Sequence, residues 1–402
     1  MMQSHVKLLH ASPGVVKMEM LKQVSEYVDK NREWIIGVLQ NLVRIPSVVG
    51  EEQKIGEYIE KVLNEIGVHV ERQNVEKDRF NVIARLKKPS TGKTLLFCGH
   101  MDTVPLSEGW TIDPFGGKII DGKLYGLGAS DMKGGLAAMI ATLKTLNDLS
   151  IEPNGNVLFV SVVDEEAYSK GILKFLEKNI RADMAVLGEP HFYETLLGYK
   201  GKMLVELVVK GRASHGSTPE HGINAINDAA KIITSLDQLN FLRHEKLGQG
   251  SLCVLKIEGG YKKYSLTTPE KATIIISRHT VPGETKEKVI NDFKQLINLI
   301  NIRSQVEIKI KPPFYSPYVL SEEEEIVKAL MRIYLKVTGR ELKIDYGTSV
   351  SDANHLVVKG GIPTVVFGPS GGNQHAPNEY VLVDQVLTVS KIYTMLAIEL
   401  LS

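Results

Sequence analysis

The stretch Leu95–Met132 decides the fold, and it opens with LLFCGHMDTVP (residues 95–105). Its first four residues form an apolar run with the length and composition of a buried strand. The run ends at His100 and Asp102, whose side chains project to the same side if the chain is still extended there. An imidazole beside a carboxylate at the carboxyl end of a strand is typical of a metal ligand with the partner that orients it.

The same stretch leads into YGLGASDMKGG (residues 125–135). Asp131 stands just before Gly134–Leu149, a run whose apolar spacing predicts a helix. Open α/β sheets bind ligands in the loops at the carboxyl ends of their strands. The two segments together therefore predict a ligand site built around His100 and Asp131.

The composition excludes several classes of protein. The chain has 402 residues, enough for two domains, and 43% of them are apolar, enough for a sizeable core. Its 48 Lys and Arg nearly balance its 47 Asp and Glu, so the net charge of +1 offers no general attraction to nucleic acid or to an anionic membrane. Cys98 and Cys253 both lie in apolar runs, which predicts a pair of buried, reduced thiols in a cytosolic protein.

Targeting signals are also missing from the sequence. No apolar run approaches the roughly 18 residues of a membrane helix. Residues 1–20 lack the apolar core of a secretory signal, and the first sixteen or so are expected to be irregular. We therefore expect a cytoplasmic protein.

Helices and strands alternate in the first half of the chain, which predicts an α/β domain with a largely parallel sheet. We expect helical residues at 33–43, 51–66, 134–149 and 171–178, and strands at 68–75, 81–86, 94–98, 156–163 and 184–187. The order then changes to βαββαβ, the ferredoxin-like split unit. Its strands are expected at 203–210, 252–257, 272–277 and 306–310, and its helices at 224–239 and 286–302.

The alternation resumes after residue 312. Ser321 with Glu324 predicts a capping box for a helix over 322–338. Further helices are expected at 351–358 and 383–401, and strands at 343–346 and 364–367. The predicted organisation is therefore a catalytic domain in two parts, 17–197 and 312–402, with an inserted domain, 198–311.

Acidic and imidazole side chains follow the predicted strands at five places. Taken singly, each is most simply a solvated loop carboxylate or a structural histidine. Taken together, they lie at strand ends of one parallel sheet, which converge on one edge. Two histidines and three or four carboxylates there can hold two divalent metals about 3.5–4 Å apart, with one carboxylate bridging them. The five places are His100/Asp102, Asp131, Glu165/Glu166, Glu189 and His375.

The doublet Glu165–Glu166 predicts a division of labour. Adjacent residues of an extended chain point in opposite directions. One carboxylate can then bind metal while the other acts as general base toward a metal-bound water. The absence of paired cysteines excludes a structural thiolate site.

The motifs in sequence resemble those of the M20 metallopeptidases and deacylases, over roughly residues 24–402. That family includes acetylornithine deacetylases and succinyl-diaminopimelate desuccinylases of amino-acid biosynthesis, aminoacylases, carboxypeptidases and dipeptidases. The resemblance implies a zinc-peptidase-like catalytic domain with an inserted lid and dimerisation domain. The segments that carry it are GHMDTVP, GASDMKGG, VDEE, GEP, GRASHGSTPEHGINAI and GNQHAPNEY.

The resemblance also implies roles for individual residues around two zinc ions per chain, with Co²⁺ or Mn²⁺ as substitutes. Asp131 bridges the ions and is followed by a cis peptide bond to Met132. The remaining ligands are His100 and Glu189 for one ion, and Glu166 and His375 for the other. In the same scheme Asp102 orients His100, and Glu165 is the general base.

Other implied roles fall on the inserted domain and on loops. In related dimers the histidine that corresponds to His215 reaches the active site of the other subunit and stabilises the oxyanion. A homodimer through residues 198–311 is therefore expected. The residues that match substrate contacts are Arg278, Asn224, Thr348, Ser349 and Asn373, for which a purely structural role is an equal alternative.

The expected reaction is hydrolysis of the amide bond of an N-acyl amino acid. Zinc lowers the pKa of a bridging water, and Glu165 takes its proton and returns it to the leaving amine. A dipeptidase or carboxypeptidase acting on a short peptide is the alternative within the family. A non-catalytic metal-binding homologue is disfavoured because every ligand position and Glu165 are filled. A nucleotide-binding protein is disfavoured because residues 90–94 fail as a phosphate loop.

Overall fold

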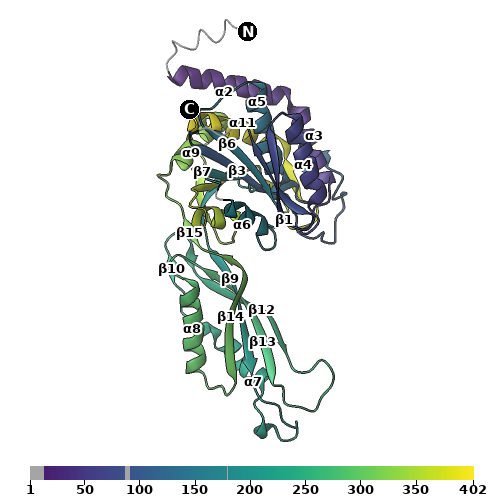
Figure 1. Cartoon of the computed structure of the whole chain (residues 1–402), viewed down its shortest axis with the longest axis vertical. Coiled ribbons are helices and arrows are strands. Elements are labelled where there is room, and N and C mark those ends of the chain that lie inside the picture. Colours follow the sequence, from purple (N-terminus) through teal and green to yellow (C-terminus); the bar gives the residue numbers. More distant parts are fainter. Residues whose placement is uncertain (1–12, 87–90, 179) are drawn as a thin grey trace. The chain divides into compact units, whose positions relative to one another are not determined.

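The computed structural model describes residues 13–86, 91–178 and 180–402 (Figure 1). The chain divides into two compact units. The large unit comprises the described residues up to Leu197 together with Leu320–Asp345 and Lys359–Ser402. The small unit comprises Gly198–Val319 and Tyr346–Val358. The domain limits expected from the sequence, 198 and 311, stay a prediction.

The main sheet of the large unit has parallel strands at its centre. The order β6–β3–β7–β17 is parallel, and β2, β1 and β8 pair antiparallel outside it. Every residue of β3 is buried, as expected for a strand with both faces covered. The expected α/β fold is confirmed. The strands are β1 (His69–Glu76), β2 (Arg79–Arg85), β3 (Thr94–His100), β6 (Asn156–Val162), β7 (Met184–Leu187), β8 (Glu194–Tyr199) and β17 (Thr364–Val366).

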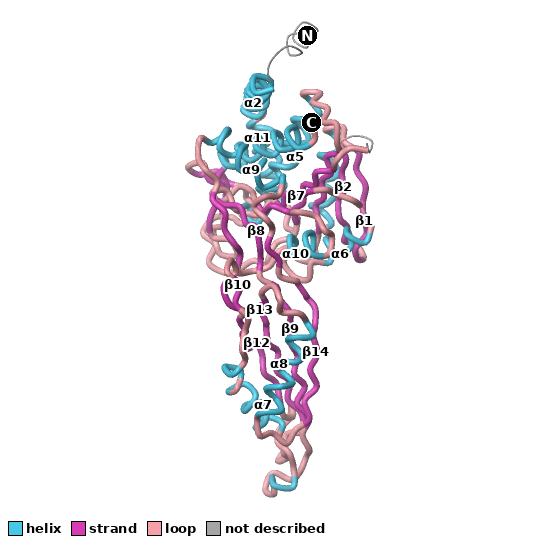
Figure 2. The backbone as a smooth tube through the Cα atoms, turned by 90° about the vertical axis from the view of Figure 1, so that its left-hand side faces the viewer, coloured by secondary structure: helices cyan, strands magenta, loops and turns pink. Residues whose placement is uncertain are grey.

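Helices cover both sides of this sheet. Figures 1 and 2 show α5 and α11 on one side and α6 on the other. Almost all residues of helix α5 are buried. Its side chains are accordingly apolar on nearly every face of the helix. The predicted helices of this unit are found within a few residues of their expected ends. They are α3 (Arg32–Arg44), α4 (Gln53–Glu65), α5 (Gly134–Asp148), α6 (Lys170–Glu177), α9 (Glu325–Thr338) and α11 (Val383–Leu400).

A small antiparallel sheet in the large unit was not expected. Its order is β18–β19–β5–β4, and its strands have only two or three residues each. Tyr380 pairs with Tyr125 in it, so the segment after His375 lies beside the segment before Asp131. Strands this short leave no periodicity to detect. They are β4 (Lys118–Ile120), β5 (Lys123–Tyr125), β18 (Gly371–Gly372) and β19 (Tyr380–Leu382).

The small unit has the expected βαββαβ order. Its sheet runs β12–β13–β9–β14 with every pair antiparallel, which is the ferredoxin-like arrangement. Both helices pack on the same apolar face of the sheet, through a core that includes Val205, Ile232 and Phe293. The elements are β9 (Gly201–Lys210), α7 (Ala225–Thr234), β12 (Ser251–Gly259), β13 (Lys271–Thr280), α8 (Lys286–Leu299) and β14 (Gln305–Tyr315).

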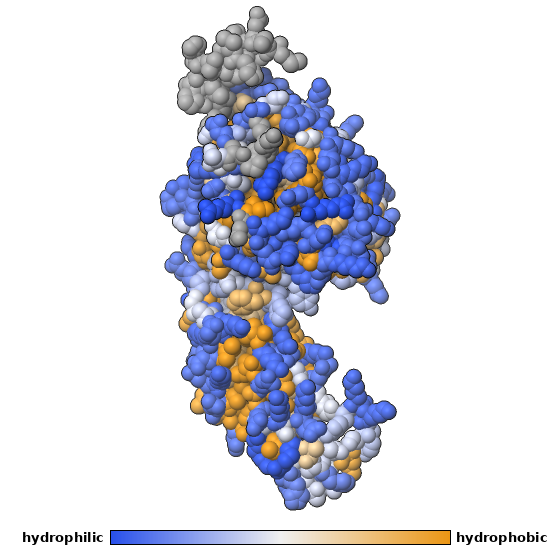
Figure 3. All heavy atoms as spheres, viewed as in Figure 1, coloured by the Kyte–Doolittle hydropathy of each residue, from blue (hydrophilic) through white to orange (hydrophobic). Residues whose placement is uncertain are grey.

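Shorter elements complete the small unit and its connections. Figure 3 shows apolar side chains gathered over α8 and β14. Val306, Ile308 and Ile310 of β14 are partly buried and pack against the core of the small unit. The shorter elements are β10 (Arg243–His244), β11 (Gly248–Gln249), β15 (Tyr318–Val319), β16 (Lys343–Gly347) and α10 (Asp352–Val358).

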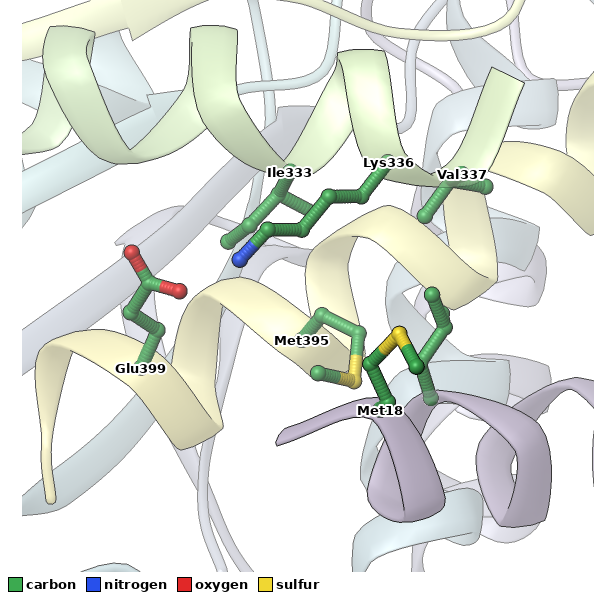
Figure 4. Close-up of a pocket in the computed structure, with 7 residues that line it drawn as sticks. Met18, Ile333, Lys336, Val337, Met395 and Glu399 are labelled. Atoms are coloured by element: carbon green, nitrogen blue, oxygen red, sulfur yellow. The ribbon is translucent and has the colours of Figure 1, made fainter. Parts of the chain in front are cut away.

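The N-terminal expectation is wrong for residues 13–16, because helix α2 spans Pro13–Lys30. Residues 1–12 lie outside the described residues. Helix α2 packs on α11 and α5. A groove of about 280 Å³ is lined by residues of α2, α9 and α11, none of which belongs to the predicted site (Figure 4). Its lining residues are Met18, Leu21, Ile333, Lys336, Val337, Met395 and Glu399.

Two smaller expectations are also wrong. Helix α9 begins at Glu325 without a side-chain cap, and Ser321 Oγ accepts the N–H of Glu323 at 3.2 Å instead. Cys98 is buried, but Cys253 is exposed because it alternates with Leu252 and Val254, which pack on the covered face of the sheet. Among the described residues, no helix is both long enough and apolar enough to cross a membrane.

Candidate metal centre

His100 ends the buried strand β3, and its ring is held from one side. Nδ1 lies 3.0 Å from the main-chain oxygen of Asp102 and 3.8 Å from its carboxylate. An N–H at Nδ1 that donates to this carbonyl leaves Nε2 as the nitrogen that faces the other residues of the site. Asp102 thus holds the ring through its backbone rather than through its side chain.

Asp131 lies between the two histidines of the site. It sits in a tight turn, Ala129–Lys133, and the Asp131–Met132 peptide bond is cis, which confirms that implication of the resemblance. Oδ1 of Asp131 is 3.1 Å from His100 Nε2, and Oδ2 is 3.4 Å from His375 Nε2. One oxygen for each histidine is the arrangement that a bridging carboxylate has.

Glu166 faces His375 from the turn that follows β6. Its Oε1 lies 2.9 Å from His375 Nε2. Ligand atoms of His100, Asp131 and Glu166 all lie within 4.8 Å of one another, close enough to belong to one metal centre. His375 has a positive φ of 58° in the loop between β18 and β19.

Glu189 completes the cluster from the end of β7. Close packing brings it near Asp131, because a Cβ on Gly135 at the start of α5 would lie 2.2 Å from the oxygen of Gly188. Oε1 of Glu189 lies 3.8 Å from His100 Nε2. Among the described residues this buried oxygen has no hydrogen-bond partner. A buried carboxylate oxygen without a partner is costly unless a cation binds it, so the donor set fits divalent metal.

Glu165 occupies the same turn as Glu166. Its side chain is outside the group formed by His100, Asp131 and Glu166, as are those of Glu189 and His375. The carboxylate of Asp102 accepts the N–H groups of Glu165 at 3.2 Å and of Glu166 at 3.0 Å. The two glutamates lie in a turn rather than in the extended chain assumed from the sequence. Asp102 therefore fixes both the ring of His100 and the backbone that carries the glutamates.

The charges of the cluster shift the pKa values of its members. Hydrogen bonds to Asp131 and Glu166 raise the pKa of His375 to about 10. Burial alone would lower the pKa of His100, but the charge of Glu189 and the hydrogen bond to Asp131 outweigh it and raise that pKa well above its ordinary value. Burial raises the pKa of Glu189 to about 7. Without metal, both imidazoles are thus protonated at neutral pH.

Metal binding is therefore expected to release protons. A metal ligates neutral imidazole and ionised carboxylate, so His100 and His375 must each lose a proton and Glu189, whose pKa is raised to about 7, about half of one. This means about two to three protons per chain near pH 7. The apparent affinity should rise with pH, by about tenfold per pH unit for each proton released. Calorimetric titration in buffers of different ionisation enthalpy measures this number. His375→Gln should release about one proton fewer, and a pH-independent affinity would contradict the prediction.

A buried ion-pair network supports the turn that carries the two glutamates. Asp164, the residue before them, lies 2.7 Å from Nη2 of Arg79, and Glu52 lies 2.8 Å from Nε of the same guanidinium. The side chains of Glu52 and Asp164 are 0% and 1% exposed. Asp164 also accepts the N–H groups of Tyr168 and Lys170. No pattern in the sequence singled out Arg79 or Glu52.

Replacing Arg79 by alanine is expected to destabilise the large unit by about 3–5 kcal/mol, because two buried carboxylates lose their partner. Urea unfolding monitored by circular dichroism measures the loss. Arg32→Ala is the matched control, since Arg32 and Asp384 form a pair whose side chains are 46% and 83% exposed, and it should cost about 0–1 kcal/mol. Equal losses in the two variants would contradict the assignment.

His215 and Asn224 lie in the small unit. His215 is exposed, and its Nδ1 accepts the N–H of Ser217 at 3.2 Å. The neutral ring therefore carries its hydrogen on Nε2. Asn224 is the N-cap of α7, and its side-chain oxygen accepts the N–H groups of Ile226 and Asn227.

The other predicted substrate contacts have structural partners or are exposed. Arg278 is 2% exposed, pairs with the buried Glu284, and donates to the oxygen of Ser251 at 3.1 Å. Asn373 is exposed and donates from Nδ2 to the oxygens of Pro377 and Asn378. Thr348 and Ser349 are exposed. The roles of these residues toward substrate stay predictions.

Two buried charged residues beside the cluster were missed. Burial raises the pKa of Glu379 to about 7, against hydrogen bonds from backbone N–H groups of the Asp131 turn. Burial likewise lowers the pKa of Lys133 to about 7, against the charges of Glu379 and Asp102. Both stand inside motifs already quoted. Lys133 lies two residues after Asp131, and Glu379 lies four residues after His375. The only signal in the sequence was this proximity.

Comparisons with known proteins give a consistent answer. A family model described as Peptidase family M20/M25/M40 matches residues 96–399. The chain is 26% identical to the N-formyl-4-amino-5-aminomethyl-2-methylpyrimidine deformylase of Halalkalibacterium halodurans, over 93% of this chain and 96% of that protein. It is 27% identical to the succinyl-diaminopimelate desuccinylase of Wolinella succinogenes, over 89% of this chain and 97% of that protein.

A solved structure agrees with the fold described above. The crystal structure of a tripeptidase from Staphylococcus aureus superposes with a TM-score of 0.76, covering 92% of this chain and 98% of that chain. The two sequences are 22% identical, so the likeness establishes the shared fold alone.

Proposed function

This chain belongs to Peptidase family M20/M25/M40, and from that premise we propose that it is a di-zinc hydrolase that cleaves the amide bond of an N-acyl amino acid. Membership makes it a metal-dependent amidohydrolase. The number of metal ions, their identity and the substrate are the parts proposed here. Zinc is favoured because imidazole and carboxylate ligands suit it, with Co²⁺ or Mn²⁺ as substitutes.

The observation that carries the proposal is the placement of Asp131 between two histidines, with buried Glu189 beside them. Each carboxylate oxygen of Asp131 faces a different imidazole. The partnerless Oε1 of Glu189 lies on the His100 side, and Glu166 lies on the His375 side. The donors thus separate into two groups that share one carboxylate, which supports two ions rather than one.

The chemistry divides between the ions and the chain. Two bound divalent cations would supply a Lewis acid and lower the pKa of a water molecule. Glu165 accepts a proton from the attacking water and passes it to the leaving nitrogen, so that a carboxylate and a free amine result. Asp102 holds the turn of Glu165 through its backbone N–H. A donor such as His215 Nε2 would stabilise the oxyanion.

The relatives favour a deacylase over a peptidase. The deformylase and the desuccinylase, at 26% and 27% identity, remove a formyl and a succinyl group, as their names state. The alternative within the family is a dipeptidase or carboxypeptidase, whose substrate differs only beyond the amide. The first relative is named for an N-formyl aminomethylpyrimidine. A compound of that kind, with a small acyl group, should therefore be tested as a substrate as well.

Metal analysis combined with a hydrolysis panel tests the proposal. The panel contains N-acetylornithine, N-succinyl-diaminopimelate, other N-acyl amino acids, an N-formyl aminomethylpyrimidine and dipeptides, each assayed with zinc and with cobalt. Near two metals per chain with turnover of an N-acyl amino acid supports the proposal. Turnover of dipeptides alone would establish the alternative, and metal binding without any turnover would leave a non-catalytic homologue. Absence of metal would overturn the metal centre itself.

We also propose that the protein is a cytoplasmic homodimer that assembles through residues 198–311. The exposed edge strand β12 supports this, because its Leu255 and Ile257 are 57% and 47% exposed and unpaired edges favour association. The apolar side chains over α8 and β14 offer a second such surface (Figure 3). Light scattering tests the dimer, and a monomer at working concentration would contradict it.

A further inference from the structure

We propose that Glu379 is a positioning residue that holds Asp131 in place for metal binding. This inference rests on the proposed function for its meaning, since it assigns a role toward the same metal centre. Glu379 is 1% exposed. It precedes β19, four residues beyond His375, and nothing in the resemblance gave it a role.

The carboxylate of Glu379 is a hydrogen-bond acceptor for the backbone of the turn that carries Asp131. Its Oε1 accepts the N–H groups of Ser130 and Asp131, each at 2.9 Å. Its Oε2 accepts the N–H of Gly128 at 2.7 Å. One carboxylate therefore satisfies three backbone donors in the turn that presents the bridging side chain.

The turn needs such an acceptor because its backbone is irregular. Gly128 has a φ of 74°, and neither Asp131 nor Met132 has helical φ/ψ, so these N–H groups have no place in a regular ladder. Buried backbone donors without a partner cost about 1–3 kcal/mol each. A hydrogen bond from an N–H group to a charged carboxylate is also stronger than one to a neutral oxygen.

Glu379 also links the two halves of the metal centre. Its own main-chain oxygen accepts the N–H of Gly126 at 2.9 Å. Gln374, next to His375, donates to Ser130 Oγ at 3.2 Å. The loop that carries His375 and the turn that carries Asp131 are thus fastened together at several points. Displacing Glu379 would shift Asp131 against both histidines.

The test compares Glu379→Gln and Glu379→Asp with a matched control, Asp228→Asn. Asp228, which is 5% exposed, also accepts two backbone N–H groups, those of Arg303 and Ser304 at 3.0 and 2.9 Å, but it lies in the small unit. Glutamine turns an NH₂ group toward at least one N–H donor. Aspartate keeps the charge but is too short to reach all three donors.

Two measurements separate the possible outcomes. In metal-free protein, hydrogen exchange should speed up by at least tenfold in the segment 128–131 for the Glu379 variants and around 303–304 for the control. Competition with a chelator should show metal affinity about 10–100-fold weaker in Glu379→Gln and unchanged in Asp228→Asn. Wild-type metal affinity in both Glu379 variants would overturn the inference. Unfolding of both variants would overturn it too, because Glu379 would then be required for folding rather than for the position of Asp131.

Failure of the proposed function gives a different result. If the wild type binds metal but hydrolyses nothing on the panel, the proposed reaction is wrong. The hydrogen-exchange rates and the metal affinities of the variants still decide whether Glu379 positions Asp131. If the wild type hydrolyses an N-acyl amino acid and Glu379→Gln keeps both metal affinity and slow exchange, the function stands and the positioning role falls.

Discussion

Replacing Glu165 by glutamine is expected to lower kcat by about 10⁴-fold, the upper end of what general acid–base catalysis contributes. Glutamine has nearly the same shape, and the backbone N–H that donates to Asp102 at 3.2 Å is unaffected. The amide cannot accept a proton from water, however, so the proton transfer proposed for Glu165 is lost while the binding of substrate is not. KM should therefore change little, and the metal content should stay at the wild-type level.

The adjacent residue supplies the control for this experiment. Glu166 lies 2.9 Å from His375, so Glu166→Gln should lose metal as well as activity. Steady-state kinetics and elemental analysis on both variants distinguish a proton-transfer residue from a ligand, although the two stand side by side in the sequence. Glu165→Gln with nearly full activity would place the general base elsewhere.

Replacing Asp131 by asparagine is the second large effect that we expect. Asparagine keeps one oxygen acceptor but loses the second, so it cannot face both histidines with oxygen. Metal affinity should fall by more than about 100-fold, beyond what loss of an orienting partner costs, and fewer than two ions should remain per chain. Calorimetric titration with zinc measures the change.

The same variant allows an independent check without metal. Hydrogen bonds to Asp131 contribute to the raised pKa of His375, about 10, and to the raised pKa of His100. In Asp131→Asn both pKa values should move down toward the ordinary range, which nuclear magnetic resonance titration detects. Asp183→Asn is the control, because Asp183 accepts the N–H of Thr94 at the opposite end of β3. Unchanged histidine pKa values in Asp131→Asn would contradict the geometry.

The sequence was a reliable guide where local pattern and long elements coincide. The buried run before His100 is indeed a strand with both faces covered, and the βαββαβ order of the small unit is correct. His100, Asp131 and Glu166 were named from strand ends, and they do converge. For His100 and Glu166 this followed from the rule that parallel strands end at one edge, since β3 and β6 are parallel. Asp131 converges for another reason, because the turn Ala129–Lys133 before α5 presents it and no strand of that sheet precedes it directly.

Contacts that involve the backbone, and ion pairs between distant segments, could not be predicted from sequence patterns. Asp102 holds His100 with a carbonyl, which any residue possesses, so its identity carries no signal for that contact. Glu379 accepts N–H groups nearly 250 residues away in sequence, and Arg79 joins Glu52 to Asp164 across three segments. Such partners are set by tertiary packing, and the three-residue strands β5 and β19, which bring Glu379 beside the Asp131 turn, are too short to show a sequence periodicity.

The small sheet that pairs β19 with β5 has a consequence for the order in which the enzyme is made. Four of the proposed ligands have been synthesised once residue 189 has joined the chain, but His375 follows 186 residues later (375 − 189). The strand that docks beside β5, Tyr380–Leu382, comes later still. The chain must therefore be extended past residue 382 before both halves of the centre can be held together. A chain that ends before residue 375 therefore contains four of the proposed ligands, His100, Asp131, Glu166 and Glu189, but lacks the fifth.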